Sequence, residues 1–73
     1  MNKSVYTKEY KSIIERLKKG RIEVGLAQQA VADKLGKPQS YISKIESGER
    51  RLDVVEIKKF ATIYKKEISF FIK

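Results

Sequence analysis

The residues best suited to chemistry lie in one short segment, 38–47, whose polar side has hydrogen-bonding groups and no carboxylate. On a helical wheel at about 100° per residue, one side holds Tyr41, Ile42, Ile45 and Glu46, and the other holds Gln39, Ser40, Ser43, Lys44 and Ser47. Small polar side chains let a helix sit deep in the major groove of DNA, which is about 12 Å wide, and a carboxylate there would be repelled by phosphate. The polar side therefore suits an anionic partner, although a solvent-exposed face that happens to be serine-rich would look the same.

The composition of the chain narrows the classes of function. The 73 residues include 17 lysines and arginines against nine acidic residues, a net charge of +8. This balance favours DNA, RNA or an anionic membrane as partner; excess lysine that only keeps a small protein soluble is the alternative. There is no cysteine and no histidine, which excludes disulfides, zinc fingers and imidazole bases. Without a nucleotide-binding glycine loop or a convergent pair of carboxylates, we expect no enzyme activity, no metal and no cofactor.

The apolar residues are too scattered for a membrane protein. The longest unbroken apolar runs, 30–32 and 70–72, are three residues long, whereas a membrane span needs about 20. The apolar stripes are expected to be buried between helices, which leaves none to insert into a membrane surface. The start of the chain has no apolar signal segment, so we expect a soluble cytoplasmic protein that forms one domain over residues 1–73.

Apolar residues at helical spacing predict an all-α fold. The expected helices span about residues 8–24, 27–35, 38–47, 53–64 and 68–72. Thr7 and Asp53 are expected to cap the first and fourth helices, and Val54 or Val55 to begin the inner face of the fourth. The last segment, ISFFI, also has high β-propensity and could form a strand instead.

Two short helices joined by a glycine turn, behind a longer first helix, are typical of a helix-turn-helix, although an ordinary helical bundle also uses glycine corners. The ordered run Q-x-x-x-A-x-x-L-G-x-x-Q-S-Y-I-S-K-I-E-S-G, from residue 28 to 48, makes the first interpretation specific. It resembles the Cro/C1-type (XRE family) helix-turn-helix domain of phage repressors and restriction–modification controller proteins, and the similarity extends over residues 10–72. The resemblance implies a compact four- to five-helix lambda-repressor-like helix-turn-helix domain that binds double-stranded DNA.

The resemblance also assigns roles to individual residues. It implies base contacts from Gln39, Ser40, Ser43 and Lys44. It implies contacts to the DNA backbone from Gln28, Tyr41, Ser47, Arg50 and Arg51, with Gln28 also able to brace the first residue of the third helix. The chemistry agrees, because glutamine can pair with adenine N6 and N7 and lysine favours guanine O6 and N7.

Two positions depart from the pattern of this family at helix starts. Pro38 stands where the family often has serine or threonine, and Ala27 replaces the hydroxyl residue that often precedes Gln28. Neither side chain can cap a helix, and Ala27 also lacks a hydroxyl for phosphate.

Arg21 falls within the apolar stripe of the first helix, near Leu17 and Tyr10. A buried guanidinium needs a counter-ion, and Glu46, on the inner side of the third helix, is the only acid placed to serve. The resemblance agrees, because the family often pairs these two positions. We therefore expect a structural ion pair; an arginine whose head reaches the surface is the alternative.

These observations predict a sequence-specific DNA-binding transcriptional regulator, a repressor or autoregulator that reads a palindromic operator through residues 38–47. The alternative is a helix-turn-helix module or antitoxin whose main partner is another protein. A homodimer is expected, because the core has room for only two of the four large apolar residues in the tail, which leaves Phe70 and Ile72 for an interface. No small-molecule ligand is expected.

Overall fold

Local capping chemistry sets where the first and fourth helices begin. In the computed structural model, which describes residues 7–72, α1 spans Lys8–Glu23 and α4 spans Val54–Tyr64. Thr7 Oγ1 accepts a hydrogen bond from the Tyr10 amide at 3.1 Å. Asp53 and Glu56 form a capping box, in which each side chain accepts from the backbone N–H of the other residue. Both predicted caps are present.

The second and third helices begin without a side-chain cap. α2 spans Gln28–Leu35 and follows Ala27, and α3 spans Gln39–Glu46 and follows Pro38. The two helices are separated by Gly36, whose φ of 68° lies in the left-handed region and closes α2. The φ of −71° at Pro38 is the value that its ring imposes, so the entry into α3 is fixed by the backbone alone.

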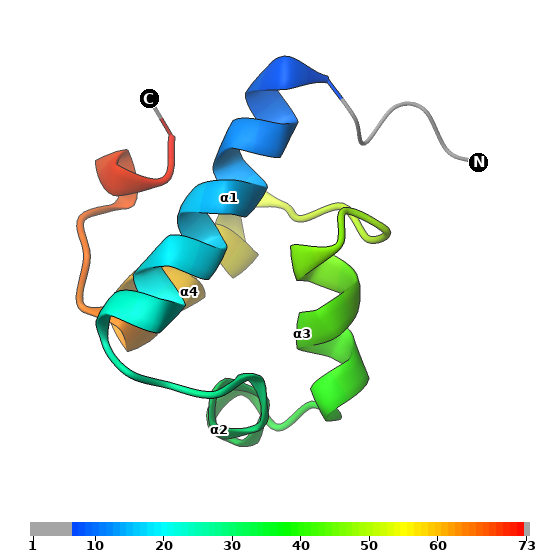
Figure 1. Ribbon diagram of the computed structural model, residues 1–73. Helices are drawn as coiled ribbons and strands as arrows, with labels where there is room; N and C mark the ends of the chain where they lie inside the picture. The colour runs from blue at the N-terminus through cyan, green and yellow to red at the C-terminus, as the bar shows by residue number, and fades with distance from the viewer. Residues whose placement is uncertain (1–6, 73) are drawn as a thin grey trace.

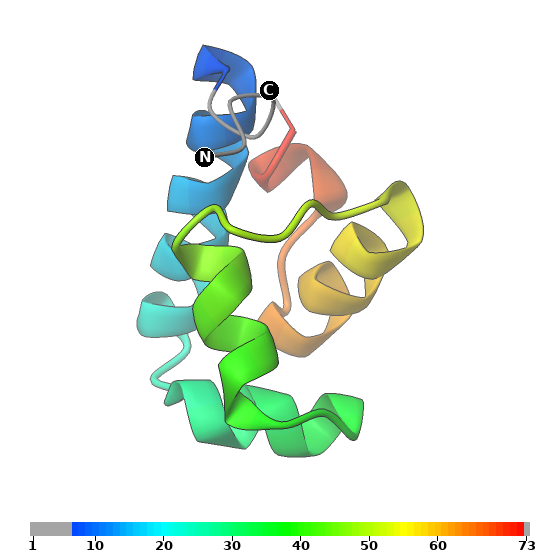
Figure 2. The same ribbon diagram turned by 90° about the vertical axis from the view of Figure 1, so that its right-hand side faces the viewer.

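The arrangement of the helices leaves α3 on the outside of the molecule. In Figure 1, α2 is seen end-on and α3 runs upward along the right-hand side of the molecule, so the two helices meet at a steep angle. α1 crosses the molecule in front of α4 (Figure 1), and α3 packs on both α2 and α1. When the molecule is turned, α3 lies along the near face (Figure 2). The long α1 thus supports α3, which in turn packs on α2.

A single apolar cluster joins these elements. Its buried members come from every helix and from the tail: Tyr10, Ile14, Leu17, Val31, Ala32, Ile42, Ile45, Ile57, Phe60, Ala61, Tyr64 and Phe71. The rings of Tyr64 and Phe71 lie against α1 at Gly20, where an added Cβ would come within 3.2 and 3.3 Å of them. Glycine at this position therefore permits the close approach of the tail to α1.

The tail turns back onto the core as a short helical turn. Lys65 ends α4 in the left-handed region with a φ of 57°, and a 3-10 helix, η2, follows at Ile68–Phe70. Phe71 is fully buried, Phe70 is half-buried, and Ile72 is 44% exposed. The strand that ISFFI could have formed is not present.

The predicted all-α fold is confirmed, since the described residues form helices and no strand. Every predicted helical range holds a helix, but the tail is a three-residue turn. One expectation is wrong: neither Val54 nor Val55 faces inward, and they are 58% and 57% exposed. The reason is that α4 begins at the rim of the core, and its buried face starts only at Ile57.

Within residues 7–72, no helix combines the length and apolarity needed to cross a membrane.

Candidate nucleic-acid interface

The outer side of α3 presents the polar surface that the helical wheel indicates. The five residues on that side are exposed: Gln39, Ser40, Ser43, Lys44 and Ser47. On the opposite side, Ile42 and Ile45 are 0% and 1% exposed and anchor the helix in the core. Figure 2 views α3 from this outer side. The helix is therefore held by one face and free to meet a partner with the other.

Carboxylates are absent from this face within the described residues, apart from one at its C-terminal end. The Glu46 side chain is only 6% exposed and is directed toward α1. Glu49, in the loop after α3, accepts a hydrogen bond from Ser47 Oγ at 3.1 Å, and the same hydroxyl lies 3.1 Å from the Lys44 carbonyl oxygen. The hydroxyl proton of Ser47 is thus engaged within the protein, which weakens the case for Ser47 as a phosphate contact.

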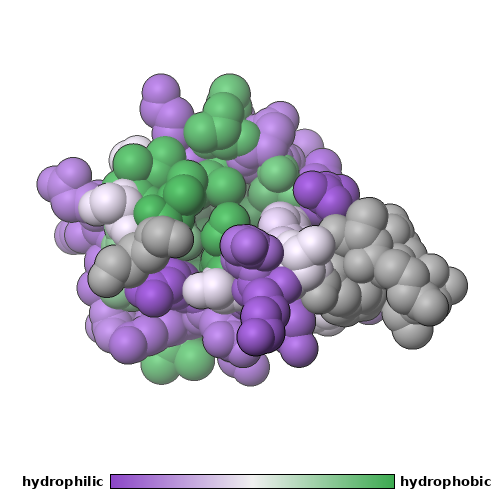
Figure 3. Space-filling view, turned by 90° about the horizontal axis from the view of Figure 1, so that it is seen from above, coloured by the Kyte–Doolittle hydropathy of each residue, from purple (hydrophilic) through white to green (hydrophobic). Residues whose placement is uncertain are grey.

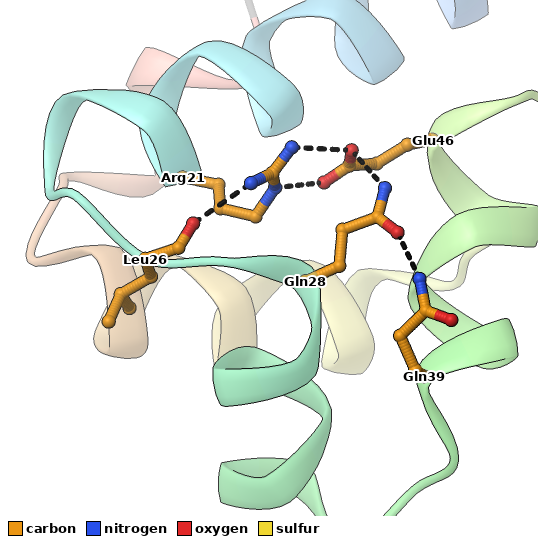
Figure 4. A network of polar contacts seen from close by, with 5 residues as sticks. All are labelled: Arg21, Leu26, Gln28, Gln39 and Glu46. Carbon is orange, nitrogen blue, oxygen red and sulfur yellow. Dashed lines mark hydrogen bonds and ion pairs between the residues drawn. The ribbon is translucent and has the colours of Figure 1, made fainter.

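Four side chains form a hydrogen-bonded row that connects α1, α2 and α3 (Figure 4). Arg21 Nε donates to Glu46 Oε2 at 2.7 Å, and Arg21 Nη2 donates to Glu46 Oε1 at 3.1 Å. Gln28 Nε2 donates to the same Oε1 at 3.0 Å. Gln39 Nε2 then donates to Gln28 Oε1. The row therefore runs from the first helix to the first residue of α3.

The ion pair between Arg21 and Glu46 is largely shielded from water. The two side chains are 12% and 6% exposed, and Arg21 Nη1 also donates to the Leu26 carbonyl oxygen at 2.9 Å. The hydrogen bond to Glu46 raises the pKa of Arg21 against the opposing effect of burial. The two predicted partners are thus in contact, and the guanidinium does not reach out to the surface as the alternative required.

Gln39 is positioned by this row while keeping groups for a partner. One N–H of its amide is bonded to Gln28, and its amide oxygen points away from Gln28 (Figure 4). The other N–H and the oxygen are the donor and acceptor that a bidentate contact to adenine uses. Because the side chain is already oriented, less conformational freedom remains to be lost when a partner binds.

The two arginines after α3 are held by two tyrosines. The Tyr10 hydroxyl donates to the Arg50 carbonyl oxygen at 3.1 Å, and the Arg51 guanidinium lies 5.3 Å from the centre of the Tyr10 ring. The Arg50 guanidinium lies over the Tyr41 ring at 4.8 Å. These contacts give the loop a defined shape at the end of α3, next to the polar face.

Tyr41 is engaged in a way that the sequence did not indicate. Its hydroxyl donates to Glu56 Oε2 at 2.7 Å, and the same oxygen lies 3.3 Å from Arg50 Nη2. Burial and then the bond to Glu56 raise the pKa of Tyr41 to about 12. The Tyr41 hydroxyl proton is therefore committed to Glu56, so a phosphate contact at this position would be made by the basic groups around the ring.

Sequence reasoning overlooked Tyr10 and Glu56 as members of this site. In the sequence, Tyr10 falls on an apolar stripe and Glu56 belongs to no DNA-binding motif. Their partners, Arg50 and Tyr41, are 40 and 15 residues away along the chain. Helical periodicity reports which face of a helix is buried, and it carries no signal for pairs this distant.

The residues expected at a dimer interface differ in exposure. Ile72 is exposed, whereas the Phe70 ring packs edge-on against Phe71 with centroids 5.1 Å apart. Lys66 Nζ lies 4.9 Å from the Phe70 ring centre, and Arg16 donates to the Phe70 carbonyl oxygen at 3.3 Å. Phe70 is thus largely engaged within its own domain.

In the part of the chain that the structure covers, no group of three acidic, histidine or cysteine side chains gathers to hold a metal ion.

Comparison with known proteins agrees with this geometry. A family model described as helix-turn-helix matches residues 17–71. Among solved structures, the chain is similar to the restriction-modification controller protein C.AhdI from Aeromonas hydrophila, with 31% sequence identity and a TM-score of 0.75 over 84% of this chain and 92% of that chain. No curated protein sequence matches the chain. The chain belongs to the XRE-type helix-turn-helix family and is a DNA-binding regulator of transcription.

Proposed function

We propose that this regulator recognises a specific operator by placing the outer face of α3 in the major groove. The observation that carries the proposal is that this face is exposed and free of carboxylates, while its first residue, Gln39, is held through Gln28 and Glu46. A helix of this kind, anchored on one side by Ile42 and Ile45, can enter the groove without rearranging the core.

Base reading and backbone holding are divided between α3 and its surroundings. We assign base contacts to Gln39, Ser40, Ser43 and Lys44. We assign backbone contacts to Gln28, Arg50 and Arg51, with the two arginines as the main phosphate ligands. The sequence also indicates Tyr41 and Ser47, but their hydroxyl protons are engaged within the protein. Backbone contacts fix the position of the protein on the duplex, and base contacts select the sequence.

The biological role proposed is that of a repressor or autoregulator acting in the cytoplasm. The similarity to a restriction-modification controller protein supports a small regulator of this type. The net charge of +8 supports attraction to DNA as a general source of affinity.

A homodimer is proposed as the DNA-binding form. The face of the molecule seen from above gathers apolar side chains (Figure 3), and η2 and the C-terminal end lie on this side (Figure 1). Val54, Val55 and Ile72 are exposed apolar residues at the start of α4 and in the tail, and exposed apolar groups of this kind often mark an interface. A two-fold dimer would read two half-sites about 34 Å apart.

Selection of bound duplexes from a random DNA pool tests the proposed function. The selected sequences should contain a palindrome with half-sites about 10 base pairs apart. If the protein contacts about six phosphates, raising the salt concentration from 50 to 200 mM should lower its affinity for DNA roughly 10³-fold. Binding that is insensitive to salt, or a pool without a common sequence, would contradict operator recognition.

Two single substitutions distinguish base recognition from contact with the DNA backbone on the selected site. Gln39→Ala should lose about 1–3 kcal/mol on that site and little on random DNA. Arg51→Ala should weaken binding to both by a similar factor. If Gln39→Ala kept the full preference of the parent, another part of the protein would have to read the sequence.

A further inference from the structure

The guanidinium of Arg50 is already paired with a carboxylate in the unbound protein. Arg50 Nη2 lies 3.3 Å from Glu56 Oε2, and the two side chains are 41% and 21% exposed. The pair is thus at the surface, where a phosphate could approach the arginine. We propose that Glu56 competes with DNA phosphate for Arg50 and so holds DNA affinity below the value that this basic loop could reach. The inference rests on the proposed function, because it requires that Arg50 faces the DNA backbone.

Arg50 has supports other than Glu56. Its guanidinium lies over the Tyr41 ring, 4.8 Å from the ring centre, and Arg50 Nη1 donates to the Arg51 carbonyl oxygen at 2.7 Å. The Tyr10 hydroxyl fixes the backbone at Arg50 itself. With these contacts in place, the carboxylate contributes mainly its negative charge.

Glu56 is held so that it cannot easily turn away when a phosphate arrives. Oε2 accepts from the Tyr41 hydroxyl at 2.7 Å, and Oε1 accepts from the Asp53 amide at 2.9 Å as part of the capping box at the start of α4. A phosphate that binds the outer side of Arg50 would therefore lie near a fixed like charge. At a separation of about 6 Å, this repulsion corresponds to a factor of about three in affinity at the dielectric constant of water, and of about ten at half that dielectric constant.

Removing Glu56 has two opposing effects on DNA affinity, and the larger one decides whether affinity rises or falls. Loss of the ion pair would leave Arg50 less ordered, which lowers affinity for phosphate. Surface pairs contribute little order or stability, and the Tyr41 ring and the Arg51 carbonyl remain as supports. Removal of the repulsion should therefore dominate, and affinity should rise.

The test is Glu56→Gln, which removes the charge and keeps an oxygen for the Asp53 amide and a partner for the Tyr41 hydroxyl. Affinity for both the selected duplex and random DNA should rise about three- to tenfold at low salt, and the gain should shrink as salt increases. Glu49→Gln is the matched control, because it removes the same charge from the adjoining loop while the Glu49 carboxylate contacts Ser47.

Repeating both substitutions in an Arg50→Ala background identifies the mechanism. The gain from Glu56→Gln should fall to less than about twofold, because its charge acts through Arg50, whereas the effect of Glu49→Gln should be unchanged. An unaltered or lower affinity for Glu56→Gln, or a gain that persists without Arg50, would overturn the inference. A parent protein that binds no DNA would instead overturn the proposed function.

Tyr41→Phe provides a second variant in case Glu56→Gln unfolds. The ring under Arg50 stays, but the hydroxyl that fixes Glu56 is lost, so the carboxylate can move away from an arriving phosphate. Affinity should rise in the same direction by a smaller factor, with thermal unfolding measured alongside. A lower affinity for folded Tyr41→Phe would show that the fixed carboxylate assists binding, contrary to the inference.

Discussion

At the scale of single residues, the row from Arg21 through Glu46 and Gln28 to Gln39 links the core to the DNA-facing surface. Its inner end is a shielded ion pair, and its outer end is an exposed amide. Hydrogen bonds therefore link the charged inner end to Gln39, the side chain assigned to base reading, and set its orientation. Substitutions at Arg21 should act on both stability and DNA recognition.

The Arg21–Glu46 pair should show strong coupling in a double-mutant cycle. Removing either partner should lower the free energy of unfolding by about 3 kcal/mol, because the remaining charge is left shielded from water without a counter-ion. The double variant Arg21→Leu with Glu46→Leu should be less destabilised than the sum of the single variants. Additive losses in urea unfolding would mean that the two charges are solvated independently.

Alkaline pH should destabilise the protein through its tyrosines. Burial raises the pKa of Tyr10 and Tyr64, and burial with the Glu56 bond raises that of Tyr41 to about 12 from the ordinary 10.0. Above pH 10 the unfolded chain releases these protons first, so stability is complete below pH 10 and falls as the pH rises toward 12. Urea unfolding between pH 8 and 11 checks this, and Tyr41→Phe should reduce the fall. A tyrosinate absorbance that is complete by about pH 10.5 in the folded protein would contradict it.

At the scale of elements, caps and turns account for most of what could be predicted. The apolar spacing located every helix, and Thr7 and Asp53 cap the helices as expected. Exposure of Val54 and Val55 could not be read from the pattern, because helical periodicity does not show where a helix leaves the core. The cluster of Tyr10, Tyr41 and Glu56 around the arginine loop depends on tertiary packing and was equally hidden.

A single substitution at the end of α4 should raise the stability of the protein. Lys65 is the only non-glycine residue with a positive φ among those described, at 57°. Lys65→Gly should raise the free energy of unfolding by about 0.5–1 kcal/mol by removing backbone strain. The matched change is Gly36→Ala, where φ is 68° and an added Cβ meets nothing within 4 Å. That variant should lose about 1 kcal/mol by strain alone. Thermal unfolding measures both; a destabilised Lys65→Gly would contradict the argument.

At the scale of the whole molecule, the fold exposes two kinds of surface. The polar face of α3 lies on one side, and exposed apolar residues lie at the start of α4 and in the tail. The all-α fold and the family were accessible from the sequence, because the run from Gln28 to Gly48 is long and ordered. The engagement of Phe70 within its own domain was not, since it depends on close approach of the tail to Gly20.

Sedimentation of the free protein at micromolar concentration tests the dimer. Ile72→Lys should shift the parent dimer toward monomer, because a charge in an apolar interface is costly. Ile22→Lys is the control: Ile22 is 59% exposed on α1, two residues and so about 200° around the helix from Gly20, where the tail rings pack. The control should sediment like the parent. A monomeric parent, or equal effects of the two variants, would rule out the proposed interface.

The central claim, that the acid-free face of α3 docks on DNA, is tested most directly by placing a carboxylate on it. Ser43 is exposed on that face, and Thr62 is exposed on α4 and gives a variant of equal charge. Ser43→Glu should lower affinity for any duplex by at least about tenfold, through repulsion from nearby phosphates. Thr62→Glu should change affinity by less than about threefold, because its charge is distant from the bound DNA. Equal losses from the two variants, or full binding by Ser43→Glu, would contradict the assignment of this face.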